Sequence, residues 1–425
     1  MKLQIRVVGN FFWVTLGEII SRGFLFMANI LLARNLGVTN FGIFALAQGI
    51  TLYFWLAVDL GTNMYGIREI ARNKDGAAEL VNTLQTMRIA AGVVVCLIYL
   101  LVVLHLDMPP LNRHAFLGCG LYLVTFAFSL DWVMKGFEKF QYLAISNLFY
   151  SVPFLAIAFF AQGDWGLVVS SFGWSCSFLG SALLLYLLLG KTGLRFRPVF
   201  HLRQWWEHVK ESIFFSLSGS LQVLSTLLPL LFLNFFYSPY EVGIFSAAYR
   251  IVSMVCIMGT FLTMACYPVF SDLYFRDMPR FILLHRKLQL AMISAGLTAA
   301  LAGYYLAPNI INSLFGVKYE GSIRILEVLI WFIPLEFFRF TYGIVFLAVN
   351  LHRHNLIIFL PGVIFMGSAC YLSGDKLNAW LPYIVLLWEL LLIGLYLLIY
   401  YVKRPLQIQT QATNGPKAPV QLGEA

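Results

Sequence analysis

Charged residues are scarce in this sequence. Only 12% of its 425 residues are Asp, Glu, Lys or Arg, whereas soluble domains carry about 25%. Hydrophobic residues make up 60% of the chain, and the mean hydropathy is +0.79. A soluble protein of this composition would expose large apolar patches and aggregate. The composition therefore excludes a soluble domain and predicts a polytopic membrane protein.

Motifs for metal, redox and nucleotide chemistry are also missing. The six cysteines lie within apolar runs and form no C-x-x-C pair, so they predict neither disulfides nor a metal site. The seven histidines show no H-E-x-x-H spacing, and no G-x-x-x-x-G-K-S/T loop is present. We therefore expect no cofactor, no bound metal and no ATP hydrolysis. The net charge of +9 does not form a basic stripe, which argues against nucleic acid as a partner.

Long apolar runs, in contrast, fill most of the chain. A membrane-spanning helix needs roughly 20 mostly apolar residues, and that length predicts an all-α fold with twelve transmembrane helices. Their approximate limits are 11–33, 41–65, 85–105, 115–134, 142–162, 166–189, 212–236, 242–269, 289–312, 323–349, 356–373 and 379–402. Lysines and arginines alternate from loop to loop, with 21 on one side of the membrane and 5 on the other; Arg88, near the second-to-third connection, is counted among the 21. Because positively charged loops stay in the cytoplasm, both termini are predicted to be cytoplasmic.

One short pattern occurs twice, half the chain apart. The segment NFGIFALAQGI (40–50) matches EVGIFSAAYRI (241–251) at a constant offset of 201 residues. Each copy opens an inward-running span, which predicts a parallel repeat of two pseudo-symmetric six-helix lobes that alternate access to a shared cleft. The predicted parts are an N-lobe (1–190), a cytoplasmic elbow (191–211), a C-lobe (212–402) and a disordered cytoplasmic tail (403–425).

A few ionisable residues lie well inside the predicted spans. They are Glu18, Arg22, Asp59, Asp131, Arg250, Glu336, Arg339 and Glu389. Such residues are energetically expensive in a bilayer and usually face a protein interior or a water-filled cavity. Their restriction to spans one, two, four, eight, ten and twelve favours a cavity shared by these helices.

The three arginines in this set predict an anionic ligand, because guanidinium groups bind phosphate oxygens bidentately. Arg22 and Arg250 lie near the membrane midplane when depth is counted by helix rise. Arg250 has no acid within four residues on its own helix. Glu18 and Arg22 are four residues apart, and Glu336 and Arg339 are three apart, so each pair shares a helix face. Simple neutralisation of an arginine by its neighbour stays open as a structural alternative.

The acids are candidates for coupling to an ion gradient. A carboxylate that alternates between water and a dry interior can load and release a proton. Glu389 and Asp59 are the main candidates, while Glu18, Asp131 and Glu336 are assigned to cavity ion pairs. A purely structural ion-pair role is the alternative for each of them.

Two segments carry a resemblance to a known family. They read LLARNLGVTNFGIFALAQGI (31–50) and DLGTNMYGIREIAR (59–72). This wording resembles the polysaccharide-transport branch, the O-antigen (Wzx-type) flippases, of the multidrug/oligosaccharidyl-lipid/polysaccharide exporter superfamily. The residues that match the family motif are Arg34, Gly37, Gly42, Asp59, Gly61, Arg68 and Glu69.

The resemblance implies a MATE-like fold in which two six-helix lobes form a V. It also implies a multi-pass protein of the bacterial cytoplasmic (inner) membrane that flips an isoprenoid-pyrophosphate-linked oligosaccharide. Expected partners are that lipid-linked oligosaccharide and membrane lipids, with a polysaccharide polymerase and a chain-length regulator as further candidates. Coupling to a proton or sodium gradient is left open.

Two other functions compete with this one. An exporter of cationic drugs with the same fold would need a site dominated by acids, whereas three intramembrane arginines favour an anion. A membrane glycan ligase or polymerase would normally carry its catalytic groups on a large external loop. The longest external loops predicted here have only about ten residues, so a transporter is expected rather than an enzyme.

Overall fold

The computed structural model describes residues 2–349 and 354–414. Within these ranges every regular element is a helix, which confirms the predicted all-α class. The helices are α1 (Lys2–Asp59), α2 (Thr62–Arg72), α3 (Ala77–His105), α4 (Pro110–Gly120), α5 (Tyr122–Ala127), α6 (Asp131–Gly136), α7 (Phe140–Phe160), α8 (Gly163–Leu189), α9 (Leu202–Phe236), α10 (Pro239–Arg276), α11 (Met278–Leu314), α12 (Gly321–Leu329), α13 (Phe332–Ala348), α14 (Asn355–Ser373) and α15 (Leu377–Asn414). Short 3-10 turns follow α8 (Gly190–Thr192), α11 (Val317–Tyr319) and α14 (Gly374–Lys376).

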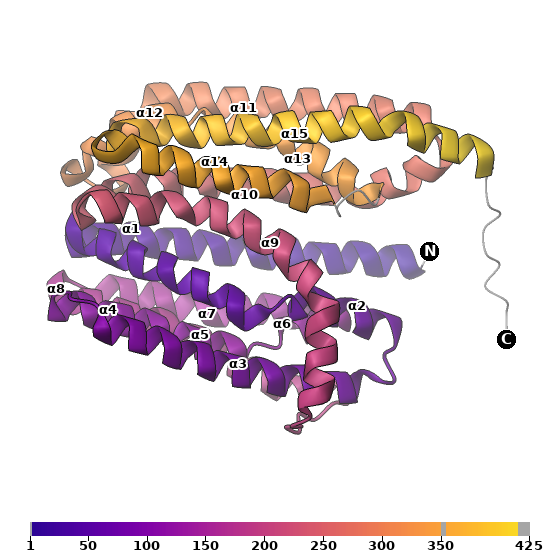
Figure 1. Cartoon of the computed structure of the whole chain (residues 1–425), viewed down its shortest axis with the longest axis horizontal. Coiled ribbons are helices and arrows are strands. Elements are labelled where there is room, and N and C mark those ends of the chain that lie inside the picture. The colour runs from indigo at the N-terminus through magenta and orange to yellow at the C-terminus, as the bar shows by residue number, and fades with distance from the viewer. Residues whose placement is uncertain (1, 350–353, 415–425) are drawn as a thin grey trace.

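The long helices form two groups that lie side by side (Figure 1). The first group contains α1 to α8, and the second contains α10 to α15. Helix α9 begins beside α2 and α3 and then runs along the second group, where it packs against α14. We call the left-hand end of Figure 1 the Gly37 end, because α1 is broken there at Gly37.

Nine helical stretches among the described residues are long and apolar enough to cross a membrane. Two of them, Gly17–Asp59 and Asn355–Val402, have 43 and 48 residues. Each contains a break, at Gly37 in the first and at Gly374–Lys376 in the second, so each is long enough for two crossings. A shorter apolar stretch, Leu227–Phe236, lies in α9. The chain is therefore a multi-pass membrane protein, while the count of twelve spans and the cytoplasmic termini stay predictions.

Several helices extend beyond the limits that hydropathy predicts, and three of them illustrate the difference. Helix α3 begins at Ala77, not at 85, and α9 begins at Leu202 and continues without a break into the span expected from 212. Helix α15 runs to Asn414, so the first part of the tail expected to be disordered is helical; residues 415–425 lie outside the described residues. Hydropathy marks only the apolar part of a helix, and backbone hydrogen bonding continues past it.

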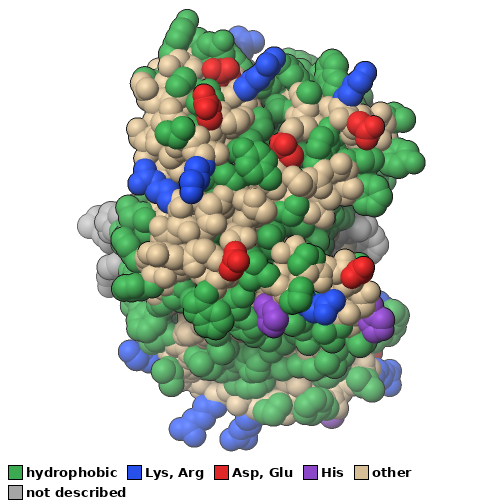
Figure 2. All heavy atoms as spheres, turned by 90° about the vertical axis from the view of Figure 1, so that its left-hand side faces the viewer, with side chains coloured by type: hydrophobic (Ala, Val, Ile, Leu, Met, Phe, Trp, Pro, Cys, Tyr) green, Lys and Arg blue, Asp and Glu red, His purple; other side chains and the backbone are tan. Residues whose placement is uncertain are grey.

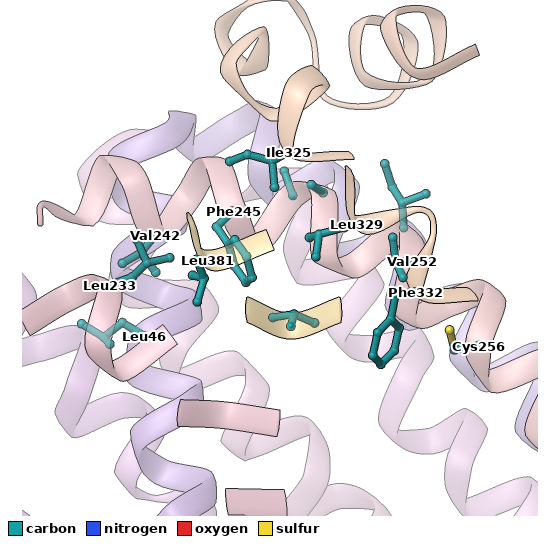
Figure 3. Packing of buried hydrophobic residues seen from close by; sticks show 14 of the residues in the cluster. Leu46, Leu233, Val242, Phe245, Val252, Cys256, Ile325, Leu329, Phe332 and Leu381 are labelled. Atoms are coloured by element: carbon teal, nitrogen blue, oxygen red, sulfur yellow. The ribbon is translucent and has the colours of Figure 1, made fainter. Parts of the chain in front are cut away.

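The largest buried cluster includes residues from both helical groups (Figure 3). Leu46 of α1 and Leu233 of α9 lie beside Val242 and Phe245 of α10, with Leu381 of α15 close by. The cysteines behave as small apolar side chains, as the sequence predicts. All six are free, and Cys96, Cys119, Cys256 and Cys370 are buried.

Candidate functional site

The two copies of the repeated pattern meet in space. A Cβ atom on Gly42 of α1 would lie 1.8 Å from the Pro239 carbonyl oxygen and 2.8 Å from the Gly243 nitrogen. A Cβ atom on Gly243 of α10 would lie 2.2 Å from the Val38 carbonyl oxygen. With backbones in such close contact, any residue larger than glycine would force the two helices apart. The duplicated glycines thus mark the place where the two helical groups cross.

Arg250 lies two helical turns beyond Gly243 and faces α1. Its Nη2 atom donates a hydrogen bond to Gln48 Oε1 at 3.0 Å, and its guanidinium carbon lies 5.2 Å from the centre of the Phe41 ring. The hydroxyls of Tyr150 and Tyr319 are within electrostatic range of the guanidinium. None of the described carboxylates forms a salt bridge with Arg250. Its positive charge therefore meets only neutral groups at the boundary between the two helical groups.

Arg22 approaches the same region from α1. It forms the ion pair with Glu18 that their spacing predicts, with 3.1 Å between Nε and Oε2, and its side chain remains 45% exposed. Asn147 of α7 donates to the other oxygen of Glu18 at 3.3 Å. One turn along α7, Tyr150 lies within electrostatic range of both Arg22 and Arg250. Tyr150 is therefore near one arginine from each helical group.

Arg339 is buried within the second helical group. Its Nε atom donates to Glu389 Oε1 of α15 at 2.5 Å, and its Nη2 atom lies 3.2 Å from Glu336 Oε1. The Arg339 side chain is 6% exposed and that of Glu389 is 0% exposed. The sequence predicts the pairing of Glu336 with Arg339, but the contribution of α15 comes only from the fold. Binding of substrate by Arg339 stays a prediction, and here both of its carboxylate partners belong to its own group.

Asp59 and Asp131 gather around an arginine that the sequence misassigns. The charge pattern counts Arg88 among the cytoplasmic loop charges, and this assignment is wrong. Because α3 starts at Ala77, Arg88 lies three turns inside the helix and is 1% exposed. Its Nη2 atom lies 3.9 Å from Asp59 Oδ1, and Asp131 is within electrostatic range.

This buried arginine is incompletely satisfied. Its guanidinium carbon lies 5.1 Å from the centre of the Phe126 ring, which supplies a cation–π contact. Its Nε and Nη1 atoms have no hydrogen-bond partner among the described residues. Burial of a charge without a full set of partners is costly. With fewer and longer polar contacts, Arg88 is also held more loosely than Arg339.

The family-motif residues around Asp59 shape a tight turn. Leu60 and Gly61 have φ angles of 48° and 74°, which end α1 and start α2. Gly61 suits this turn because glycine adopts a positive φ angle without steric cost. The D-x-G motif therefore has a conformational reason besides any role of its carboxylate.

Further along α2, Arg68 and Glu69 form an ion pair with 2.7 Å between Nε and Oε1. Arg72 approaches the same Glu69 oxygen at 3.5 Å. These motif residues lie at the end of the molecule opposite to Gly37, and they do not contact Arg22 or Arg250.

Arg34 connects the two helical groups at the Gly37 end. Its Nε atom donates to the Leu314 carbonyl at 2.6 Å, and its Nη2 atom donates to the Ser313 carbonyl. These carbonyls end α11, where a helix has unsatisfied acceptors and the negative end of its dipole. Beside them, the Tyr319 hydroxyl donates to the Ala33 carbonyl at 2.9 Å. The backbone of Gly37, with φ 78° and ψ 171°, then turns α1.

Sequence reasoning missed several residues of this region. Gln48, Tyr150 and Tyr319 are uncharged, so a search for ionisable groups in apolar runs passes over them. Gln48 lies next to Gly49, the position that the repeat aligns with Arg250, and that proximity was a usable signal. Within the described part of the chain, no group of three or more His, Cys, Asp or Glu side chains is placed to hold a metal ion.

Comparison with protein families decides the relationship. A family model described as polysaccharide biosynthesis protein matches residues 7–274, which is more than half of the chain. The chain belongs to this family. A protein of Escherichia coli (strain K12) whose name assigns it to O-antigen transport is 22% identical over 302 residues, 70% of this chain and 73% of its own.

Solved structures share the fold of this family member across nearly its whole length. An inward-facing multidrug-resistance MATE transporter of the MOP superfamily aligns with a TM-score of 0.70 at 15% identity, covering 93% of this chain and 96% of its own. The lipid II flippase MurJ, in an inward closed conformation, aligns with a TM-score of 0.63 at 12% identity, covering 95% and 93%. The similar structures confirm the predicted MATE-like fold. The family match, together with the relative assigned to O-antigen transport, supports the predicted superfamily and a transporter rather than an enzyme.

Proposed function

We propose that this chain flips an isoprenoid-pyrophosphate-linked oligosaccharide from the inner to the outer leaflet of the bacterial cytoplasmic membrane. The observation that carries the proposal is Arg250, a cation at the boundary of the two helical groups that forms no salt bridge with any described carboxylate. Membership of the polysaccharide biosynthesis family supports a glycan as the cargo. The names of similar proteins, one assigned to O-antigen transport and one a lipid II flippase, support a lipid-linked form of it.

In this proposal Arg22 and Arg250 hold the pyrophosphate. Both lie within electrostatic range of Tyr150, so an anion beside this tyrosine would meet a guanidinium from each lobe. Pyrophosphate oxygens accept bidentate hydrogen bonds from such groups. Gln48 keeps Arg250 oriented in the absence of the ligand. Arg339 has a different role, because its guanidinium is already paired with two carboxylates. It holds Glu336 and Glu389 together in the C-lobe.

Transport follows from alternating access between an N-lobe (1–190) and a C-lobe (212–402), joined by the elbow at 191–211. We assign twelve spans, cytoplasmic termini and an external Gly37 end. The contacts of Arg34 with the end of α11, and of Tyr319 with Ala33, then hold the external side closed. Opening toward the outside requires these hydrogen bonds to break while the pyrophosphate keeps both arginines engaged.

Each lobe also holds a group that suits coupling to a proton or sodium gradient. Arg339 with Glu336 and Glu389, and Arg88 with Asp59 and Asp131, each contain one more acid than base. Binding of one cation neutralises either group when all its members are ionised. We expect Glu389→Gln or Asp59→Asn to abolish stimulation of transport by an imposed pH gradient. Unchanged stimulation in both variants would exclude these acids as carriers.

A cation-coupled multidrug exporter is the second candidate, favoured by the similarity to a MATE transporter of that type. The two candidates differ in the charge of their cargo. Reconstitution of the full chain into liposomes separates them, with a fluorescent isoprenoid-pyrophosphate-linked oligosaccharide and a leaflet-specific quencher in one arm and a cationic dye in the other. We expect movement of the lipid-linked glycan only. Movement of the dye without the glycan would promote the exporter.

The proposed setting is the inner membrane, where the product of flipping is available to a polysaccharide polymerase and a chain-length regulator. Membrane lipids surround the spans, and no nucleic acid takes part. The lipid-linked oligosaccharide itself is the only partner that the transport reaction requires.

A further inference from the structure

A second hollow lies within the C-lobe, apart from Arg22 and Arg250. It has a volume of about 900 Å³ and opens at the Gly37 end between the starts of α10, α12 and α15. This volume falls within the range of small-ligand pockets. Figure 2 looks onto this end of the molecule, where acidic and basic side chains are interspersed among hydrophobic and uncharged ones.

Aromatic rings form much of the wall of this hollow. Trp380, Tyr383 and Tyr240 line it and are 55%, 45% and 44% exposed. The centres of the Trp380 and Tyr383 rings are 6.1 Å apart, and their planes meet at 61°. Exposed ring faces of this kind pack against the flat, weakly polar C–H faces of pyranose sugars, which combine an apolar face with polar edges.

Hydrogen bonds that join α10 to α15 fix the positions of several polar groups that line the hollow. The Asn378 amide donates to Glu241 Oε2 at 2.8 Å, and its backbone N–H donates to the Tyr237 hydroxyl at 3.1 Å. The Tyr237 hydroxyl in turn donates to the Asp375 carbonyl. These contacts hold carboxylate, amide and hydroxyl groups in place beside the rings, and such groups bind sugar hydroxyls as donors and acceptors.

The charges around the hollow balance. Arg324 and Lys376 are opposed by Glu241 and Asp375, and none of these four forms a salt bridge with a described residue. An anionic lipid headgroup would be favoured by an excess of positive charge, which this hollow lacks. Balanced charges with free hydrogen-bonding capacity favour a neutral, hydroxyl-rich ligand instead.

The position of the hollow matches the path of a glycan that leaves the protein. Tyr240 also lines a smaller hollow of about 470 Å³ formed by residues 36–40 of the N-lobe and Lys318. The smaller hollow therefore lies at the boundary between the lobes, and Tyr240 separates it from the larger one. A sugar chain that emerges between the lobes would meet Tyr240 first.

We propose that the hollow lined by Trp380, Tyr383, Tyr240 and Asn378 is an exit site that binds the sugar part of the transported molecule on the external face. This inference rests on the proposed function, since it assumes a glycan as cargo. It assigns the sugar and the pyrophosphate to different places: the pyrophosphate to Arg22 and Arg250 and the sugar to the aromatic hollow.

The test is binding of a lipid-free neutral oligosaccharide to the detergent-solubilised full chain. The probe is the glycan released by hydrolysis from the lipid-linked donor of the transport assay, and the readout is saturation-transfer NMR with titration. We expect Trp380→Ala with Tyr383→Ala to weaken binding at least about tenfold, as for loss of an aromatic anchor. Arg250→Gln should bind this probe as the parent does, because the probe has no pyrophosphate.

A second variant fills the hollow without removing any side chain. Gly321 lines the hollow, and a Cβ atom there would meet only Ile244, at 3.5 Å, so Gly321→Leu is sterically tolerated at its Cβ. We expect it to lose probe binding, whereas the matched control Gly367→Leu, with nothing within 4 Å of its Cβ, should keep it.

The outcomes separate this inference from the proposed function. If the lipid-linked donor is flipped but the free glycan binds neither the parent protein nor the Gly367→Leu control, the exit site is excluded. The proposed flippase function is then unaffected. Displacement of the free glycan by glycerophosphoglycerol, a soluble headgroup mimic, would contradict the sugar assignment and indicate a lipid site. If the glycan binds but the donor is not flipped, the proposed function fails instead.

Discussion

Each helical group buries one arginine beside two carboxylates, yet the two arginines are held very differently. Arg339 in the second group has carboxylate oxygens at 2.5 and 3.2 Å. Arg88 in the first group has its nearest carboxylate oxygen at 3.9 Å and two nitrogens without partners among the described residues. Arg250, at the boundary between the two groups, forms no salt bridge with a described residue and donates to an amide.

The three arginines differ in how far their charge is already compensated, and therefore in how strongly they can bind an additional anion. A guanidinium with two close carboxylates has its charge compensated and mainly fixes the packing around it. One with a distant carboxylate can rearrange at little cost. One with only neutral partners keeps its full attraction for an anion. On this basis we propose a structural role for Arg339, a movable ion-pair group for Arg88 and ligand binding for Arg250.

The largest expected effect is on the stability of the second helical group. Arg339→Met leaves Glu336 and Glu389 buried without their cation, which should lower the free energy of unfolding by about 3 to 5 kcal/mol. For Arg88→Met we expect a loss below about 2 kcal/mol, because its ion pair is loose. Thermal unfolding in detergent measures both. Equal losses of stability in the two variants would contradict the claim that Arg339 is held more tightly than Arg88. The double variant Arg339→Met with Glu389→Leu should recover part of the loss caused by Arg339→Met alone.

A smaller effect is expected where α1 and α10 of the two helical groups cross. Gly42→Ala places a Cβ atom 1.8 Å from the Pro239 carbonyl oxygen, so α1 and α10 must separate, at a cost of about 1 to 3 kcal/mol. Distances between spin labels at positions 40 and 318, in a background without other labelled sites, should lengthen in this variant. The matched control is Gly49→Ala, whose Cβ would meet only Leu230 at 3.9 Å. Identical distances in both variants would mean that this crossing does not set the closure of the Gly37 end.

The smallest effect concerns the elbow. Tyr65 of α2 contacts His208 Nδ1 of α9 at 3.1 Å. Burial lowers the pKa of His208 below its ordinary value, and the nearby carboxylates, Glu211 first, oppose this only in part. The unfolded chain then takes up the proton more readily than the folded one.

The contribution of His208 to stability is therefore complete above the ordinary histidine pKa of about 6.5 and decreases as the pH falls toward the lowered pKa of the folded state. We expect the midpoint of thermal unfolding to fall slightly more between pH 7.5 and pH 5 in the parent than in His208→Gln. An equal fall in both proteins would show that this contact does not respond to pH.

The sequence predicts the parts of the molecule that depend on local composition. Apolar runs predicted the helices, and the spacing of Glu18 and Arg22 and of Glu336 and Arg339 predicted their ion pairs. The repeat also pointed to Gly42 and Gly243. Contacts that need the tertiary fold were out of reach, because no local pattern brings Glu389 of α15 to Arg339.

The assignment of Arg88 failed for a related reason. Arg88 lies at the start of the apolar run predicted from 85, so the charge count grouped it with the cytoplasmic loop next to it. Hydropathy detects where a helix becomes apolar, not where its hydrogen bonding begins, and α3 already begins at Ala77. The buried polar neighbours Thr83, Gln85 and Thr86 show that this part of α3 is packed inside the protein. A polar stretch that continues an apolar helix without Gly or Pro is the signal to use.

The central claim is that Arg250 binds the pyrophosphate of the cargo, and the rate of flipping by Arg250→Gln in proteoliposomes tests it most directly. Loss of a charge-assisted contact should lower the rate on the order of 10- to 100-fold relative to the parent. Gly49→Ala, at the matching position of the first repeat, should transport at the parental rate when expression is equal. Parental transport by Arg250→Gln would contradict the account.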